Sequence, residues 1–491
     1  MLQTGRGTRP DRRCWRRRPR HGSRANAVPA TARPKISRAS QATLPRPLLA
    51  AVPPNETQRR GKLAVARYAQ SAGIKKRLVR LVVTPVGSRH ETVGIAISAL
   101  AQFAGPGQAS ILGRKERLDI LNAALINGIS SHVLDYDDTH SHNIVHPAGP
   151  VVSAILALSE QRPISGTDFV NALAIGVDVE CRIGNSVYPK HYDAGWHITG
   201  TAGVFGAAAA AGKLLGLSEQ QMLWALGLAA TQPVGLQEMF GSMTKSFHPG
   251  RAAQNGLTAA LLASKNFTSS EQSLEAKYGW ANVVSTAHNY DEITKRLGES
   301  SELLKNTYKP FACGVVMHAT IDGCIQLRNE NKLSAEDIAS VELKVHPLVM
   351  QLTSKKTPQT GLEGKFSIYH AASVALVEGA GGIDQFSDRA VRDRMIASLR
   401  DRVSTVVDSS VHEDQVRITL TRKNGSRLEK FVEHAVGSLD HPMSDNDLEA
   451  KFSGLTMAVL SNQQQRKLMD LCWKVEGLPK VSVITDAARA A

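Results

Sequence analysis

The sequence predicts a mainly α-helical protein, with a large all-helical domain and a smaller α+β lid domain inserted before the C-terminal helices. From about residue 90 to 300, apolar residues recur with helical spacing and strand signals are almost absent. From about 305, apolar and polar residues alternate as in half-buried strands, and helical spacing returns near the end. The expected segments are a tail over 1–62, the helical domain over 63–304 and 440–491, and the lid over 305–439.

The tail carries nearly all of the net charge of +15. Residues 1–60 hold 15 of the 59 Lys and Arg residues but only 2 of the 44 Asp and Glu residues. A segment so rich in Arg, Ser, Ala and Pro cannot build a core, so we expect it to be disordered. A transit-like peptide, an artefact of the gene model, and a segment that binds RNA or an anionic membrane all fit this composition. Because the rest of the chain is nearly neutral, we do not expect a nucleic-acid enzyme.

The cysteine pattern and the hydropathy indicate where the protein works. Five scattered cysteines without CxxC spacing are typical of reduced thiols, so we expect an intracellular protein, cytoplasmic or mitochondrial. No apolar run reaches the ~18 residues of a transmembrane helix, so no membrane partner is expected. The apolar run 201–212 is mostly Ala and Gly, which would let two helices approach closely.

Capping motifs mark several expected helix starts in the helical domain. Ser165 stands three residues before Asp168, and Ser218 three residues before Gln221, which is the spacing of a capping box. Residues 77–86 fit a helix or a strand equally well.

The lid is predicted to contain helices and a small sheet. Residues 334–337 begin a short helix, residues 340–346 alternate as a strand, and residues 366–403 have helical spacing. Two further strands, 416–420 and 427–432, flank Asn424-Gly425, which predicts a hairpin with a type I′ turn. A capping motif at Ser444 and Asp447 starts the return to helices.

The segment 134–147 concentrates ionisable side chains at the end of a predicted helix. It holds three aspartates and three histidines, Asp135, Asp137, Asp138, His140, His142 and His146. A zinc site formed by the histidines and Asp135 is one interpretation, but the spacing matches no familiar zinc motif. A metal–diphosphate site lacks a second acidic motif, and a simple helix cap leaves the histidines unexplained. An acid–base site is the leading interpretation.

Three other clusters add cations and proton carriers. His197 stands before the Gly/Ala-rich helix, Lys245, His248 and Arg251 lie together before another helix, and His318 follows the motif that begins at residue 308. GxGxxG, GxxxxGK[ST] and GxSxG motifs are absent from the sequence, which argues against nucleotide chemistry and serine hydrolysis. Several cations beside proton carriers suit a di- or tricarboxylate substrate.

These motifs, in this order, resemble the MmgE/PrpD family, which includes 2-methylcitrate dehydratase and cis-aconitate decarboxylase. The segments that carry the resemblance are 134–147, 195–203, 241–256, 308–318 and Lys365-Phe366-Ser367. The resemblance implies an all-helical domain with an α+β lid, a homodimer, and catalysis with neither metal nor cofactor.

The resemblance also implies which residues form the site. The catalytic residues would be Asp135, His146, His197 and Lys245, and the substrate-binding residues Thr139, His318, Lys365, His370 and Arg251. The sequence departs from the pattern of some members in the lid, where His370 stands at a position that they fill with tyrosine and Tyr369 lies one residue earlier.

The expected reaction is dehydration of 2-methylcitrate or a related alkylcitrate. Lys245 would hold carboxylates, one of His146 and His197 would remove a proton, the other or a lid residue would protonate the leaving hydroxyl, and Asp135 would orient an imidazole. The runner-up is decarboxylation of cis-aconitate to itaconate, and epimerisation of an amino-dicarboxylate also fits. The alternative from another class is a non-catalytic helical dimer that binds carboxylates.

Overall fold

The computed structural model describes residues 83–490 of the chain. The basic tail and residues 77–82 of the ambiguous 77–86 segment therefore lie outside the described residues. The described part of that segment is helical, because α3 begins at Val83 and ends at Gly87. The longer helices that follow are α4 (Glu91–Leu100), α5 (Ile120–His132), α6 (Ala148–Ser159), α7 (Gly166–Val187), α9 (Ile198–Leu215), α10 (Glu219–Ala230) and α11 (Thr244–Ala263).

The starts of α7 and α10 confirm the predicted serine caps. The Ser165 side chain accepts a hydrogen bond from the backbone N–H of Asp168, and Ser218 forms a complete capping box with Gln221. These bonds satisfy backbone donors that a helix leaves free in its first turn.

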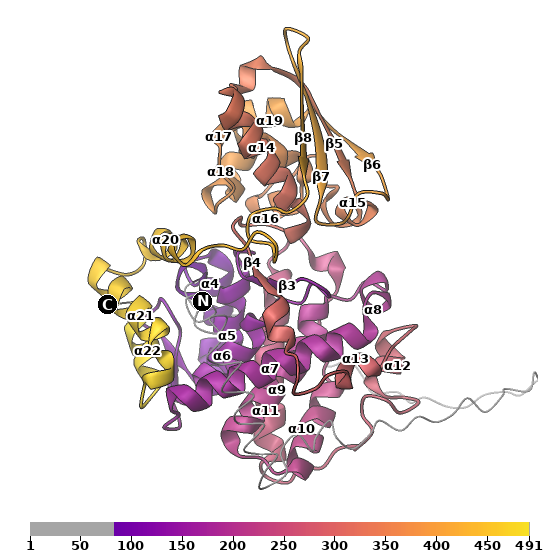
Figure 1. The fold of residues 1–491 in the computed structure, drawn as a ribbon. Coiled ribbons are helices and arrows are strands. Elements are labelled where there is room, and N and C mark those ends of the chain that lie inside the picture. The colour runs from indigo at the N-terminus through magenta and orange to yellow at the C-terminus, as the bar shows by residue number, and fades with distance from the viewer. Residues whose placement is uncertain (1–82, 491) are drawn as a thin grey trace, which may run out of the picture. The chain divides into compact units, whose positions relative to one another are not determined.

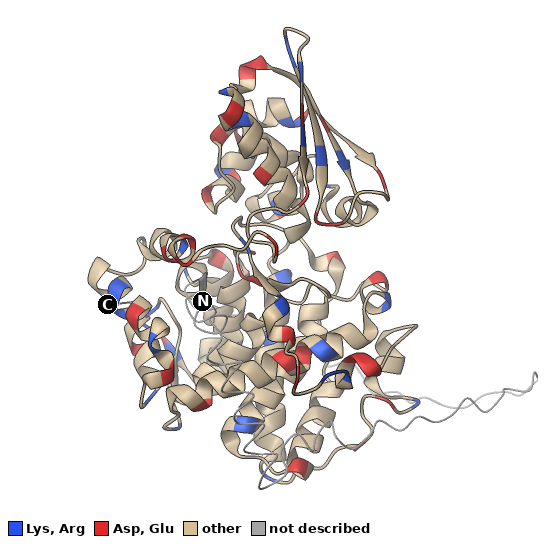
Figure 2. Ribbon diagram, viewed as in Figure 1, with Lys and Arg blue, Asp and Glu red and all other residues tan. Residues whose placement is uncertain are grey.

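Five helices, α5, α6, α7, α9 and α11, pack against one another around the main core (Figure 1). The predicted close approach is present, because a Cβ atom added to Gly256 of α11 would lie only 2.5 Å from the Cβ of Ala207 of α9. In Figure 2 the ribbon of these helices is mostly tan, and charged residues lie mainly on outer helices and loops. The helical core is thus built from small and apolar residues that leave few places for charge.

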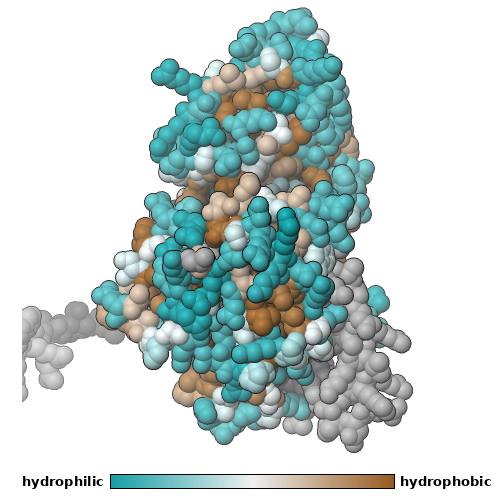
Figure 3. Space-filling view, turned by 90° about the vertical axis from the view of Figure 1, so that its left-hand side faces the viewer, coloured by the Kyte–Doolittle hydropathy of each residue, from teal (hydrophilic) through white to brown (hydrophobic). Residues whose placement is uncertain are grey.

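The helix α9 also has the length and hydropathy of a membrane-crossing helix. It is the one such helix among the described residues, and 83% of its 18 residues are buried inside the protein. That burial is typical of the central helix of a folded core. Much of the face in Figure 3 is hydrophilic, with smaller hydrophobic areas between polar side chains.

The α+β part contains a four-stranded sheet in the order β6-β5-β7-β8. The strands are β5 (Ile338–Val345), β6 (Val403–Val407), β7 (Val416–Arg422) and β8 (Arg427–Val432), and the helices include α14 (His318–Asn331), α15 (Pro347–Thr353), α17 (Ile368–Glu378), α18 (Asp388–Arg392) and α19 (Arg394–Arg400). Val341, Leu343 and Val345 of β5 are buried in its core with residues of α14 and α17, as the alternation predicted. The mainly helical fold class with a small α+β region is therefore confirmed.

Two details of this sheet differ from the sequence prediction. The hairpin between β7 and β8 is present, but Gly425 (φ +84°) has a positive φ and Asn424 does not, so the turn is not type I′. The strand β6, parallel to β5, falls where the helical prediction for 366–403 ends and was not predicted. Three of its five residues are exposed, so it lacks the alternating burial that would mark it in sequence.

Two three-residue strands bring distant segments of the chain together at the site. The strand β3 (Asp138–His140) pairs antiparallel with β4 (Asn306–Tyr308), and Asp138 lies opposite Tyr308. This pairing brings the segment after α5 beside Lys309, 174 residues later in the chain. Another short pair joins β1 (Ala109–Ser110) to β2 (Arg117–Leu118).

The last helices return to the main helical core. They are α20 (Asp445–Thr456), α21 (Asn462–Trp473) and α22 (Ser482–Ala487). Ser444 and Asp447 form the predicted capping box at the start of α20. Leu448, Phe452 and Ile484 are buried in the same cluster as residues of α5 and α7.

Candidate active site

The site begins where α5 ends. His132 is the last residue of α5, and Asp135 follows in the left-handed region with φ +51°, its N–H donating to the His132 carbonyl at 2.8 Å. Aspartate tolerates this conformation better than most residues. The turn directs the chain into the segment 135–140, which supplies most of the acidic side chains of the site.

The Asp135 carboxylate is buried between two lysines. Its Oδ1 lies 2.5 Å from Lys309 Nζ, and its Oδ2 lies 3.0 Å from Lys245 Nζ. Burial alone would raise the pKa of Asp135, but the two ammonium groups hold it well below its ordinary value. Burial lowers the pKa of Lys245 despite Asp135, whereas Asp135 and Asp137 together raise the pKa of Lys309. Lys309 is therefore a firmly charged partner of this carboxylate.

A second aspartate fixes the tautomer of His132. Asp137 Oδ2 lies 2.5 Å from His132 Nδ1, and Lys245 Nζ lies 3.0 Å from His132 Nε2. A carboxylate only accepts and an ammonium only donates, so His132 carries its proton on Nδ1 and accepts at Nε2. Burial lowers the pKa of His132 more than Asp137 raises it, so this ring is neutral near pH 7.

His146 has its tautomer set by the backbone. Its Nδ1 lies within hydrogen-bonding distance of the Asp138 carbonyl oxygen and 3.1 Å from Thr139 Oγ1, and its backbone N–H donates to Thr199 Oγ1. Since a carbonyl oxygen only accepts, Nδ1 carries the proton and Nε2 has a free lone pair. Burial, followed by the charge of Lys309, lowers its pKa well below the ordinary value. His146 is thus a neutral base in a buried setting.

His197 stands immediately before α9. Its Nδ1 lies 2.9 Å from Nδ1 of His248, and its buried Nε2 has no hydrogen-bond partner among the described residues. The edge of its ring contacts Phe240, with centroids 5.1 Å apart. Burial, and then the nearby His248 and Lys245, lower its pKa well below the ordinary value.

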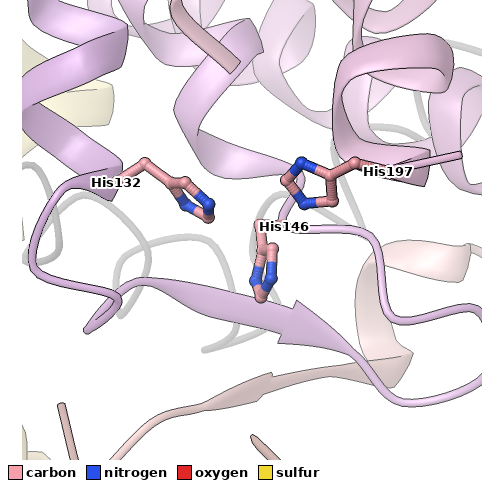
Figure 4. A group of neighbouring side chains, drawn as sticks. All are labelled: His132, His146 and His197. Atoms are coloured by element: carbon pink, nitrogen blue, oxygen red, sulfur yellow. The ribbon is translucent and has the colours of Figure 1, made fainter. Parts of the chain in front are cut away.

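The rings of His132, His146 and His197 face one another (Figure 4). Their centroids are separated by 4.9 Å for His132 and His146, 5.7 Å for His132 and His197, and 6.2 Å for His146 and His197. We call these three rings the histidine cluster. Neutral imidazoles beside buried ammonium groups can remove or return protons while the cations stabilise a developing negative charge.

The histidine cluster could in principle hold a metal ion, since three of its nitrogens lie within 4.8 Å of one another. Zinc–nitrogen bonds of about 2.0–2.1 Å require tetrahedral ligands closer together than that, about 3.4 Å apart. In addition, the His132 Nε2 lone pair already accepts from the Lys245 ammonium group at 3.0 Å. A divalent ion would have to displace a cation that is ion-paired to Asp135, so the donor set fits proton chemistry better.

The alternatives considered from sequence are not assembled by the structure. His140 does not face the histidine cluster, because its Nε2 lies 3.1 Å from Glu302 Oε2, and His142 is exposed. A zinc site of His140, His142, His146 and Asp135 therefore does not form. Asp138 Oδ2 accepts from Asn306 Nδ2 at 2.5 Å, while Asp135 and Asp137 face lysines and a histidine. The three aspartates therefore do not converge on a shared cation site.

Two predicted lid residues lie near the cluster. Lys365 is buried and donates to the carbonyl oxygens of Leu134 at 2.8 Å and Ala312 at 2.7 Å, and burial lowers its pKa to about 8. Burial, then Lys309, lowers the pKa of His318 to about 3, and its Nε2 has no partner among the described residues. His318 lines a cavity of about 510 Å³ together with Thr139 and Lys309. The rings of the histidine cluster and Lys245 do not line this cavity. His132, Asp135, Lys245 and Lys365 instead line a separate small pocket of about 10 Å³.

Two predicted substrate-binding residues lie elsewhere. His370 Nε2 donates to the Gln385 carbonyl oxygen at 2.8 Å and its ring packs edge-on against Phe386, inside the α+β part. The Arg251 guanidinium bonds to Gln254 on the next turn of α11. Neither side chain contacts the histidine cluster or its lysines.

Four residues of the site were not among the predicted catalytic and substrate-binding residues, namely His132, Asp137, His248 and Lys309. Asp137 and His248 lie in clusters noted in the sequence, but neither was assigned a role there. His132 and Asp137 flank Asp135 closely, and His248 follows Lys245 by three residues, which places both on one face of a helix. That spacing was a usable signal for His248. Lys309 arrives through the pairing of β3 with β4, which the sequence pattern does not reveal.

Comparisons with known proteins agree with the resemblance seen in the motifs. The MmgE/PrpD N-terminal domain matches residues 78–293, and the MmgE/PrpD C-terminal domain matches residues 311–475. A cis-aconitate decarboxylase of Aspergillus terreus is 26% identical over 430 residues, covering 82% of this chain and 88% of that protein. The cis-aconitate decarboxylase of Mus musculus is 27% identical over 397 residues, covering 77% and 80%. That of Homo sapiens is 26% identical over 424 residues, covering 82% and 86%.

Proposed function

Because this chain belongs to the MmgE/PrpD family, whose members are lyases, we propose that it decarboxylates cis-aconitate. The observation that carries the proposal is the histidine cluster of neutral imidazoles beside the buried Lys245 and Lys309. The names of the similar proteins support decarboxylation ahead of dehydration. This reverses the order suggested by the sequence, in which dehydration of 2-methylcitrate stood first.

The charges around the site suit a tricarboxylate. Lys245 and Lys309 both pair with Asp135, and Lys309 also lies 3.5 Å from Asp137, so a substrate carboxylate can replace part of these contacts without leaving an ammonium group unpaired. Thr139 and His318 add a hydroxyl and an imidazole on the wall of the cavity of about 510 Å³. Lys309 lines the same cavity and is buried, so a substrate would meet this cation only after leaving bulk water, which strengthens the ionic contact.

For decarboxylation, the protein mainly has to hold these groups in position around the substrate. The bond between a carboxylate and its carbon breaks, carbon dioxide leaves, and the electron pair remains on a carbon conjugated with a neighbouring carboxylate. The nearby ammonium groups stabilise that charge, and an imidazole of the histidine cluster then delivers one proton to the carbon. The trianion and one proton become a dianion and carbon dioxide, so each turnover consumes a proton.

Dehydration of 2-methylcitrate would use the same groups in a different order. One imidazole would accept the proton next to a carboxylate, and another would donate a proton to the departing hydroxyl group. The two reactions share their need for a stabilised carbanion, and they differ in whether carbon dioxide or water is lost.

Mass spectrometry of the products tests the proposal. Purified protein is incubated separately with cis-aconitate, 2-methylcitrate and citrate. We expect loss of carbon dioxide from cis-aconitate and formation of itaconate. Loss of water from 2-methylcitrate with no reaction of cis-aconitate would establish the dehydratase instead. No product from any of the three, in a sample shown to be folded by circular dichroism, would contradict both assignments.

A further inference from the structure

One member of the histidine cluster differs from the other two in what holds its ring. His132 Nδ1 faces the Asp137 carboxylate and His146 Nδ1 faces the Asp138 carbonyl, and both partners can only accept a hydrogen bond. These two tautomers are therefore fixed. His197 Nδ1 instead faces Nδ1 of another imidazole, His248, at 2.9 Å. An imidazole nitrogen can either donate or accept, so this contact fixes neither ring by itself.

We propose that His248 is a positioning residue that couples its own tautomer to that of His197, so that His197 can present either a lone pair or a proton to the substrate. A hydrogen bond between the two Nδ1 atoms contains one proton. If His197 carries it, Nε2 of His197 is a base. If His248 carries it, the proton of neutral His197 is on Nε2, which is then an acid. The role rests on the proposed function, because it concerns the proton that a lyase must move.

The fold holds both rings in the geometry that this coupling needs. His248 lies in α11 one turn after Lys245, and His197 precedes α9, with its N–H donating to the Gly235 carbonyl at 3.0 Å. Gly235 has φ +110°, and a Cβ atom there would lie 3.0 Å from His248 Nδ1 and 3.3 Å from His197 Cβ. A glycine at this position therefore leaves the space in which the two rings meet.

The buried Nε2 of His197 is the end of this pair that faces the reaction. It has no partner among the described residues, and its ring lies with those of His132 and His146 (Figure 4). The charged and titratable groups that act on the pair are Lys245, His132 and His146. Burial, then His132 and Lys245, lower the pKa of His248 to about 3, so neither ring of the pair is cationic near pH 7.

The proton balance of decarboxylation follows from this pair. After carbon dioxide leaves, the His197 Nε2–H bond breaks and the proton forms a C–H bond with the carbon that holds the electron pair. His197 Nδ1 takes the proton of His248 Nδ1, and His248 Nε2 takes one from water, so both rings stay neutral. When product leaves, water in the emptied site protonates His197 Nε2, the shared proton returns to His248, and His248 Nε2 releases its proton. The cycle consumes one proton.

Substitutions of His248 test the role, with His191 as the matched control. His248→Phe removes the partner of His197 Nδ1, whereas His248→Asn keeps an amide group near the position of the lost Nδ1. His191 is also buried, and its Nε2 bonds Thr201 Oγ1 at 2.9 Å without contacting the histidine cluster, so His191→Phe controls for the loss of a buried imidazole.

We expect His248→Phe to lower kcat on cis-aconitate by about 10²-fold, with a much smaller change in KM. The arm of the pH–rate profile that reports His197 should also move, and His248→Asn should recover about tenfold of the lost kcat. A purely structural role would lower thermal stability and leave the pH profile in place. Unchanged kcat and an unchanged pH profile in folded His248→Phe would overturn the proposal.

Nitrogen-15 NMR of the histidine side chains separates this proposal from the proposed function, because it needs no turnover. In the resting protein, we expect the His197 signals to report a mixture of two tautomers. In His248→Phe they should report one tautomer, whereas in His191→Phe the mixture should remain. If wild-type protein acts on no tricarboxylate yet shows this coupling, the proposed function fails and the coupling stands. A His197 tautomer that His248→Phe does not alter would refute the coupling whatever the activity.

Discussion

The helical part and the α+β part of the chain both bury histidines and lysines, but they use them differently. In the helical part, His132 and Lys245 direct polar atoms toward other ionisable side chains. In the α+β part, Lys365 and His370 direct theirs to backbone carbonyl oxygens. Burial lowers the pKa of all four groups, so a shifted pKa does not distinguish them. Their hydrogen-bond partners do distinguish them. These partners indicate that the helical part carries the proton chemistry and that the α+β part supports the site structurally.

The largest effect should come from removing the cation that joins the two parts. Lys309→Met would leave Asp135 and Asp137 buried with one fewer cation, so we expect the free energy of unfolding to fall by about 3–5 kcal/mol. Urea unfolding measures this. Lys430→Met is the matched control, because Lys430 pairs with the exposed Glu330, and it should cost less than about 1 kcal/mol. Equal losses of unfolding free energy for the two substitutions would show that the buried ion pair stabilises the fold no more than the surface pair does.

A smaller loss of stability is expected on substitution of Lys365. Whether stability or KM changes shows which role this lysine has. Because the Lys365 ammonium group bonds two carbonyl oxygens, Lys365→Met should lower the free energy of unfolding by about 1–3 kcal/mol. It should change kcat and KM less than a substitution in the histidine cluster. A large rise in KM with unchanged stability would show instead that Lys365 holds a substrate carboxylate, as the sequence motif suggested.

The pH dependence of stability gives the smallest effect and distinguishes histidines from aspartates. Burial lowers the folded-state pKa of His318 and His248 to about 3 each, so below pH ~6.5 the unfolded chain binds protons that the folded chain does not. The free energy of unfolding should therefore decrease from pH ~6.5 downward, by about 1.4 kcal/mol per pH unit for each such histidine. Asp135 and Asp137, with lowered pKa values, contribute stability that is lost only below pH ~4.

Urea midpoints at pH 7.5 and pH 5.5 measure this slope. His318→Leu should make it shallower by the contribution of one proton. A slope that begins only below pH 4, or one that His318→Leu leaves unchanged, would mean that the buried histidines titrate alike in both states.

Much of the site was predictable because local spacing carries it. Asp135, His146 and Lys245 stand in short motifs whose residue types already point to acid–base chemistry. In the structure Lys245 pairs with Asp135, and His146 Nδ1 lies 3.7 Å from Asp137 Oδ1. The helical segments and the hairpin after residue 416 were predictable for the same reason, since each is defined by spacing within about ten residues.

The rest depends on contacts between distant segments. Lys309 reaches Asp135 through two three-residue strands, too short to show alternation. The strand β6 pairs in parallel with β5 and exposes three of its five residues, so its sequence shows no buried face. His370 stands at a motif position, yet its Nε2 donates a hydrogen bond to a carbonyl oxygen 15 residues away in the chain. Sequence spacing identifies candidate groups, and tertiary packing decides which of them meet.

The most direct test of the difference between the two parts is a matched pair of substitutions. His146→Ala and His370→Ala each remove one buried imidazole, from the helical part and the α+β part respectively. The rate of carbon dioxide release from cis-aconitate is measured for both, with folding verified by circular dichroism. We predict that His146→Ala lowers kcat by about 10²–10⁴-fold, while His370→Ala keeps most of the wild-type rate. Equal losses, or a larger loss for His370→Ala, would contradict the assignment of the chemistry to the histidine cluster.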